Sequence, residues 1–121
     1  MHNQELGQIG EELAVRELED RGYAILARRY RTKLGEIDVV ARDGLTLVFV
    51  EVKARAGDDF GGGAAAVTRW KQRRLTLMAL DYLARHRLEE RPCRFDVVTV
   101  DVVERQAPRV EIYENAFESI G

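Results

Sequence analysis

One stretch of the chain decides the fold: residues 36–55, which read EIDVVARDGLTLVFVEVKAR. Two runs rich in β-branched residues, 36–42 and 45–55, flank the dipeptide Asp43-Gly44. Tight two-residue hairpin turns strongly prefer such a dipeptide between two strands. We therefore predict a β-hairpin with Asp43-Gly44 as its loop.

The side chains of this hairpin can be assigned to faces by counting outward from the turn. With Asp43-Gly44 as the loop, Arg42 faces Leu45, so Asp38 stands opposite Phe49 and diagonal to Glu51. Residues two apart in a strand share a face. The count therefore places three carboxylates and one lysine on the same side: Glu36, Asp38, Glu51 and Lys53. A slip of one residue would reverse every side chain, so this geometry depends on the turn.

This charged face lies in an apolar setting. Carboxylates on a strand made mostly of Val and Phe repel one another and resist desolvation unless a cation compensates them. An oxygen-only site of Asp38, Glu51, a backbone carbonyl and waters suits Mg²⁺ or Mn²⁺, which often meet a substrate phosphate. Lys53 would position a water and offset negative charge. The alternative is a solvated strand face, because Glu-x-Lys is a short and common pattern.

Length and composition fit one domain. The 121 residues are 45% hydrophobic and 33% charged, which is ordinary for a single globular domain. Cys93 is the only cysteine, so an intramolecular disulfide and a cysteine zinc site are excluded. The start of the chain lacks a basic segment followed by an apolar one, and Glu51 interrupts the best apolar run. We expect a cytoplasmic protein that does not bind to membranes.

The charges are segregated along the chain. The formal net charge of −2 counts mildly against nonspecific binding to DNA. Basic residues nevertheless cluster in 28–33 and 69–74, whereas acidic residues gather in 11–20 and 111–118. This clustering is sufficient for a basic groove, so we expect nucleic acid, DNA in the first place, as the partner.

Helices and further strands are predicted around the hairpin. Helical spacing of apolar residues predicts one helix over 5–22 and a second from a cap at Thr68 to about His86. Further strand-like segments are residues 23–30, 93–103 and 109–113. Residues 57–66 predict a flexible loop, and 115–121 a loose tail. The fold class is α/β, with a central mixed sheet flanked by helices in the order α-β-β-β-α-β.

Five motifs together resemble a known family. They are GEELA at 10–14, GEID at 35–38, FVEVKAR at 49–55, KQRRL at 71–75 and RFDVV at 94–98. The hairpin motifs resemble the PD-(D/E)xK nuclease superfamily, which includes archaeal Holliday-junction resolvases, and the full set resembles the bacterial YraN-like proteins. The resemblance implies a restriction-endonuclease-like core and a metal-dependent endonuclease of DNA repair or recombination, with branched or flapped DNA as candidate substrates. Ile37 replaces the superfamily's usual proline and leaves the metal ligands in place.

The resemblance also implies roles for single residues. It makes Asp38, Glu51 and Lys53 catalytic, and the two carboxylates would hold Mg²⁺ or Mn²⁺ together with the backbone carbonyl of Val52. Glu11 matches an acidic residue that resolvase-like nucleases bring from the first helix to the metal, through water. The alternative for Glu11 is an exposed acid that the helix dipole favours. The two hypotheses weigh about evenly.

Substrate binding is implied for the second helix. Gln72 matches a glutamine that supports the lysine or contacts the phosphate in resolvase-like nucleases. Candidates for binding the phosphate backbone are Lys71, Arg73, Arg74 and Arg55. Among them Arg55 is favoured, because it shares a face with Lys53. The alternative for the helix residues is an ordinary solvated face.

Other residues of these motifs have simpler expected roles. Arg94 and Asp96 are expected to pair with charges at the sheet rather than to act in catalysis. Trp70 is expected to anchor the core or an interface rather than to stack on a splayed base. Gly7 and Gly10 would let the first helix approach the sheet closely.

Two further hypotheses remain beside the nuclease. A catalytically silent module of the same fold, binding nucleic acid or serving as a scaffold, would agree with the mild acidity. A homodimer would widen the basic surface, and the sequence does not decide whether one forms.

Overall fold

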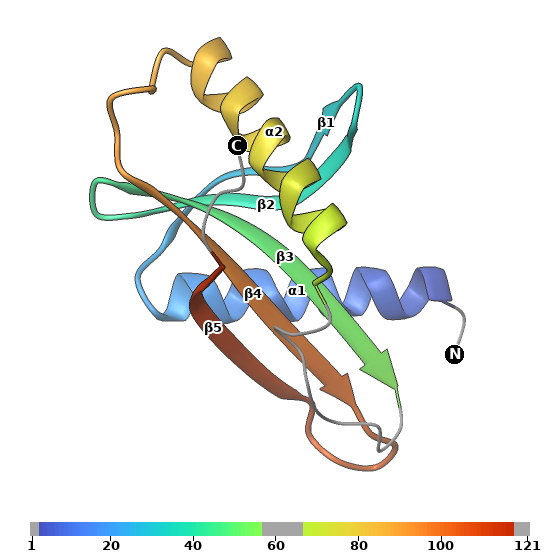
Figure 1. Cartoon of the computed structure of the whole chain (residues 1–121). Coiled ribbons are helices and arrows are strands. Elements are labelled where there is room, and N and C mark those ends of the chain that lie inside the picture. Colours follow the sequence, from blue (N-terminus) through green and yellow to red (C-terminus); the bar gives the residue numbers. More distant parts are fainter. Residues whose placement is uncertain (1–2, 57–66, 118–121) are drawn as a thin grey trace.

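A computed structural model describes residues 3–56 and 67–117, which form one five-stranded mixed sheet between two helices (Figure 1). The elements in chain order are α1 (Asn3–Asp20), β1 (Ala24–Thr32), β2 (Gly35–Asp43), β3 (Thr46–Ala56), α2 (Arg69–Arg85), β4 (Cys93–Val102) and β5 (Arg109–Phe117). The strands lie in sequence order across the sheet, and only β3 and β4 are parallel. The α/β class and the restriction-endonuclease-like core are confirmed, with β5 added to the predicted order.

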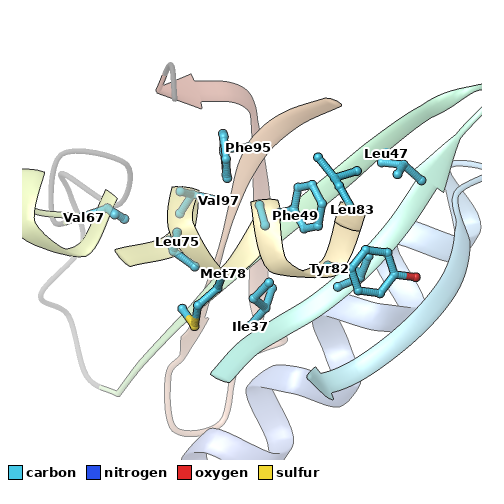
Figure 2. Packing of buried hydrophobic residues seen from close by; sticks show 12 residues of the cluster. Ile37, Leu47, Phe49, Val67, Leu75, Met78, Tyr82, Leu83, Phe95 and Val97 are labelled. Carbon is cyan, nitrogen blue, oxygen red and sulfur yellow. The ribbon is translucent and has the colours of Figure 1, made fainter. Parts of the chain in front are cut away.

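Each helix covers one face of the sheet. Alternate residues of a strand point to opposite faces, so Val48 and Val50 pack under α1 whereas Leu47 and Phe49 pack under α2. The α1 layer is closed by Ala14, Val15 and Leu18. Figure 2 shows the α2 layer, where helix residues meet strand residues: Leu75, Met78, Tyr82 and Leu83 over Ile37, Phe49, Phe95 and Val97. Two separate cores therefore hold the sheet from both sides.

Both helices end close to where the sequence predicts. The backbone turns out of α1 at Gly22, whose φ of +92° favours glycine, and the amide of Tyr23 donates to the carbonyl of Leu18 at 2.9 Å. Thr68 caps α2, because its hydroxyl accepts from the amide of Lys71 at 3.2 Å. His86 is the C-terminal cap.

The predicted hairpin is confirmed, but its turn lies one residue later than expected. Asp43 pairs with Thr46, so the loop is Gly44-Leu45, and Val39 pairs with Val50. Gly44 has a φ of +61°, the conformation that type II′ turns require of their first loop residue. The register therefore shifts by two residues, which keeps the predicted faces of β3 and brings Asp38 level with the position of Glu51 rather than Phe49. In β2 the alternation is broken beside Asp38, because Ile37 packs in the α2 core and Val39 in the α1 core.

The ends of the described segments refine two other expectations. β5 extends to Phe117, which pairs with Phe95, so part of the stretch predicted as a loose tail belongs to the sheet. The predicted loop over 57–66 and residues 118–121 lie outside the described residues. No helix among the described residues is long and apolar enough to cross a membrane.

Candidate active site

The strands β2 and β3 separate at Asp38. Their pairing runs from the turn to Val39 and Val50. At the next position a side chain replaces the backbone pairing between the two strands: Oδ2 of Asp38 accepts a hydrogen bond from the amide of Val52 at 2.8 Å. β3 meanwhile continues beside β4 as far as Ala56. The sheet is therefore held together at the hairpin turn and opened near the other end of β2.

A cavity of about 600 Å³ lies at this opening. It is bounded by the first half of α1, the separated ends of β2 and β3, and the start of α2. The charged residues that line it are Glu11, Arg29, Arg31, Glu36, Asp38, Glu51, Lys53 and Lys71. A smaller cavity of about 220 Å³ adjoins it toward α2 and shares Glu36, Asp38, Glu51 and Lys71. The structure thus brings together all four predicted catalytic residues, from three separate elements.

Asp38 and Glu51 are held close together in a setting that disfavours two negative charges. Glu51 is only 6% exposed. Burial, followed by the charge of Glu51, raises the pKa of Asp38 to about 7, although the amide of Val52 and the ammonium of Lys71 act in the opposite direction. A second positive charge at this point would favour the ionised form of both carboxylates.

Two lysines approach the same carboxylate oxygen. Nζ of Lys71, from α2, lies 2.7 Å from Oε1 of Glu51, and Nζ of Lys53, from β3, lies 3.8 Å from it. Burial and the neighbouring ammonium of Lys71 lower the pKa of Lys53. Burial is the largest single influence on Lys71 and acts to lower its pKa, but hydrogen bonds to Glu51 and Lys53, together with the charges of Glu51 and Asp38, outweigh it and the pKa is raised. Lys71 is therefore the firmer cation, and Lys53 releases its proton more readily.

Glu11 reaches the cavity from α1 and is held by arginines of β1. Its Oε2 lies 2.8 Å from Nη2 of Arg29 and 3.5 Å from Nη2 of Arg28. Its Oε1 is buried and has no hydrogen-bond partner among residues 3–56 and 67–117. The neighbouring Glu12 points outward and pairs with Arg28 at 2.7 Å. Of the two alternatives for Glu11, the exposed acid is therefore wrong, because the side chain is buried beside the cavity.

Close approach of α1 to the sheet depends on one of the two predicted glycines. A Cβ built on Gly10 would lie 2.5 Å from the Cβ of Ala54, so this position admits no side chain without movement. A Cβ built on Gly7 would meet nothing within 4 Å. Gly10 alone brings α1 against β3, and with it the following residue, Glu11.

The donor set around the cavity is compatible with a hard divalent cation. Asp38 and Glu51 supply oxygen, and Val52, whose backbone carbonyl was the third predicted ligand, lines the same cavity. No group of three or more His, Cys, Asp or Glu side chains in the described part of the chain is placed to hold a metal directly. Contact of Glu11 with a metal through water stays a prediction, and Glu11 does line the same cavity as the two carboxylates.

Comparison with known proteins places the chain among relatives. The family model described as "Uncharacterised protein family UPF0102" matches residues 10–100. The chain belongs to this family. A UPF0102 protein of Geobacter metallireducens is 48% identical over 98% of this chain and 96% of its own length. Relatives from Symbiobacterium thermophilum and Ralstonia nicotianae are 47% and 49% identical, over 94% and 92% of this chain and 97% and 85% of their own lengths. The predicted YraN-like membership is confirmed.

Three residues predicted to bind substrate lie elsewhere in this UPF0102 protein. The side-chain amide of Gln72 donates from Nε2 to the backbone carbonyl of Val67 at 2.8 Å, which stabilises the start of α2. Arg55 forms a two-bond pair with the buried carboxylate of Asp101, at 2.8 and 3.2 Å. Arg73 is exposed on the outer side of α2. None of the three lines either cavity described above, so contact with a phosphate remains a prediction for each.

The family motif RFDVV has a structural role, as the sequence indicated. Asp96 is fully buried and accepts bonds from Nε of Arg94 at 3.0 Å and from the amide of Asn115 at 2.9 Å. Arg94 also reaches Asp43 at 3.1 Å, beside the hairpin turn, and bonds to the hydroxyl of Tyr23. This network joins three strands, β2, β4 and β5, to the α1–β1 connection at the end of the sheet away from the cavity.

Sequence reasoning missed two features of the site. The pairing of Lys71 with Glu51 was not foreseen, although Lys71 stands in a basic motif of the family. The ion pairs of Glu11 with Arg28 and Arg29 were not foreseen either, and the sequence contains only a weak signal for them. Arg29 adopts a φ of +51° at the place where β1 passes Asp38, which no sequence pattern announces.

Proposed function

We propose that this UPF0102 protein is a metal-dependent endonuclease that hydrolyses phosphodiester bonds in DNA. The observation that supports it most is the meeting of Asp38, Glu51 and Lys53 in one open cavity. Two adjacent carboxylates, one with a pKa raised to about 7, are unfavourable without a cation. Such strongly shifted groups in a cleft are typical of catalytic sites.

Asp38, Glu51 and the carbonyl of Val52 would hold Mg²⁺ or Mn²⁺, with Glu11 joined through water. When bound, the ion supplies Lewis-acid activation of the phosphate and increases the acidity of a coordinated water. Nζ of Lys53 lies 3.8 Å from Oε1 of Glu51, so Lys53 would position the attacking water beside the ion. Its positive charge would offset the negative charge that develops on the phosphate.

The surroundings of the cavity favour an anionic polymer as substrate. Arg29 and Arg31 of β1 and Lys71 of α2 line it. Each of them pairs with a carboxylate of the cavity: Glu11, Glu36 and Glu51, respectively. These cations would guide a phosphate backbone across the site by exchanging a carboxylate for a phosphate oxygen. Branched or flapped DNA remains the candidate substrate, in repair or recombination.

The decisive experiment is a cleavage panel of single-stranded, duplex, flapped and four-way DNA with Mg²⁺, Mn²⁺ or EDTA. We expect metal-dependent cleavage that falls at least a hundredfold in Asp38→Asn and in Lys53→Met, with unchanged circular dichroism. Lys33→Met, which removes an exposed lysine from the β1–β2 turn, is the matched control. Unchanged cleavage in both site variants would contradict the proposal.

One observation favours a second candidate, a catalytically silent module that binds nucleic acid. Lys71 already neutralises Glu51 at 2.7 Å, which lets the site persist without a metal. Calorimetric titration with Mn²⁺ distinguishes the two functions. A nuclease binds the ion and loses this binding in Asp38→Asn, whereas a silent module shows no heat that depends on Asp38.

A further inference from the structure

Trp70 lies in the first turn of α2 and is exposed, with 66% of its surface accessible. Of the two roles expected from the sequence, an anchor of the core or of an interface, this exposure rules out the core role. The guanidinium of Arg74, one turn further along the helix, stands over the indole ring at 4.6 Å from its centroid. This cation–π contact fixes a large aromatic surface in place without burying it. We call the pair the Trp70–Arg74 platform.

The platform adjoins the candidate catalytic carboxylates. Arg74 lines the cavity of about 220 Å³ together with Asp38 and Glu51. Its Nη2 is also close to β2, because a Cβ built on Gly35 would lie 2.7 Å from it. Lys71, the residue after Trp70, reaches Glu51 directly at 2.7 Å. A ligand resting on the indole would therefore lie beside Arg74, which borders the cavity of the carboxylates.

Charge around the platform indicates what kind of ligand it suits. The first turn of α2 contains no acidic residue, and Arg69 and Arg73 are exposed beside the tryptophan. The partial positive charge of a helix N-terminus acts in the same direction. An exposed aromatic ring among cations matches a nucleotide, whose base stacks while its phosphate pairs with the basic groups. An acidic partner would match only the cations of this surface, and a purely apolar partner would match only the aromatic ring.

We propose that the Trp70–Arg74 platform stacks an unpaired nucleobase of the substrate strand whose neighbouring phosphodiester enters the cavity. This inference rests on the proposed nuclease function and defines its substrate class. A base inside a duplex has no free face to offer, so the platform selects single-stranded ends, flaps or splayed junction strands over blunt duplex. Arg74 positions the ring and faces the phosphate side of the same nucleotide.

The chain carries its own fluorescent probe, because Trp70 is the only tryptophan among its 121 residues. In EDTA, where no metal-dependent cleavage occurs, we expect a short oligothymidylate to quench the tryptophan fluorescence. A fully abasic oligonucleotide of the same length carries the same phosphates without bases and should neither quench nor bind as tightly. A blunt hairpin duplex should also fail to quench.

Variants measured by the anisotropy of a labelled oligothymidylate complete the test. Trp70→Ala should weaken binding about 5- to 150-fold, the range that loss of one base stack gives, and Trp70→Phe should retain most of the affinity. Leu80→Ala is the matched control, since Leu80 is an exposed apolar residue of the same helix at 53%. It should leave binding unchanged.

Three results would overturn the platform: equal binding of the abasic strand, unchanged affinity of Trp70→Ala, or a dimer that Trp70→Ala dissociates without affecting the oligonucleotide. The last result would assign Trp70 to a protein interface. Failure of the two proposals can be told apart. Cleavage by a wild type whose fluorescence does not respond defeats the platform alone, whereas quenching in a protein that cleaves no substrate defeats the nuclease alone.

Discussion

Replacing Asp38 with asparagine is expected to stabilise the protein at alkaline pH, although it removes a candidate catalytic group. Burial and the charge of Glu51 raise the pKa of Asp38 from its ordinary value of 3.8 to about 7. The folded state therefore binds this proton more tightly than the unfolded chain does. Ionisation of Asp38 consequently costs nothing below pH 4, lowers stability progressively between pH 4 and 7, and has its full effect above pH 7.

The size of the effect follows from the displacement of the pKa. A difference of one in pKa between the folded and unfolded states corresponds to 1.36 kcal/mol, so the full cost of ionising Asp38 in the folded state is roughly 4 kcal/mol. Asparagine cannot ionise, and its amide oxygen can still accept from the amide of Val52. Allowing for relaxation around the site, we expect Asp38→Asn to raise the free energy of unfolding by about 2–4 kcal/mol at pH 8.5, and by less than about 1 kcal/mol at pH 4.

Urea denaturation followed by circular dichroism, in EDTA at pH 4, 6.5 and 8.5, measures this difference. In thermal melts, a gain of 2–4 kcal/mol corresponds to roughly 8–16 °C for a domain of this size. Asp20→Asn is the control, because Asp20 is an exposed carboxylate at the end of α1. Equal or lower stability of Asp38→Asn at pH 8.5, or a gain that does not vary with pH, would refute the claim that Asp38 is electrostatically strained.

Two other predictions concern the elements that frame the cavity. Gly10→Ala should lower the free energy of unfolding by about 1–2 kcal/mol in urea, because its Cβ would lie 2.5 Å from that of Ala54. Gly7→Ala, which meets open space, should raise it by about 0.5–1 kcal/mol, and equal effects would contradict the close approach of α1. Lys71→Met should bind Mn²⁺ roughly tenfold more tightly in calorimetry, because an ammonium 2.7 Å from Glu51 competes with the ion. Weaker Mn²⁺ binding by Lys71→Met would show that Lys71 supports the metal site instead of competing with the ion for Glu51.

The shared face of the catalytic residues could be predicted from sequence even though the turn was misplaced. The side chains of a strand alternate with a period of two, and the error at Gly44-Leu45 changed the register by two residues. Glu51 and Lys53 kept their predicted face of β3, and Asp38 lines the same cavity although the alternation of β2 is broken between Ile37 and Val39. Only the distance along the strand changed, and it brought Asp38 nearer to Glu51 than the sequence indicated.

The pairing of charged side chains could not be predicted, because it depends on how separate elements pack. Arg55 and Lys53 share a face in the sequence pattern, yet Asp101 of the parallel neighbour β4 engages Arg55. Lys71 reaches Glu51 only because the first turn of α2 is set over the open end of β3. Both contacts join residues far apart in the chain, where local periodicity carries no information.

The two ends of the β2–β3 pair differ: the end at the hairpin turn is held by a buried network, whereas the open end holds the two carboxylates. At the turn, Arg94 joins Asp43 to the buried Asp96, and Phe49 is packed under α2. At the open end, Asp38 and the buried Glu51 line the same cavity, and burial with the charge of Glu51 raises the pKa of Asp38. Groups that repel would move apart if their strands were free to do so. The buried network and the two cores oppose that movement, so the two carboxylates stay close together, as the proposed metal site requires.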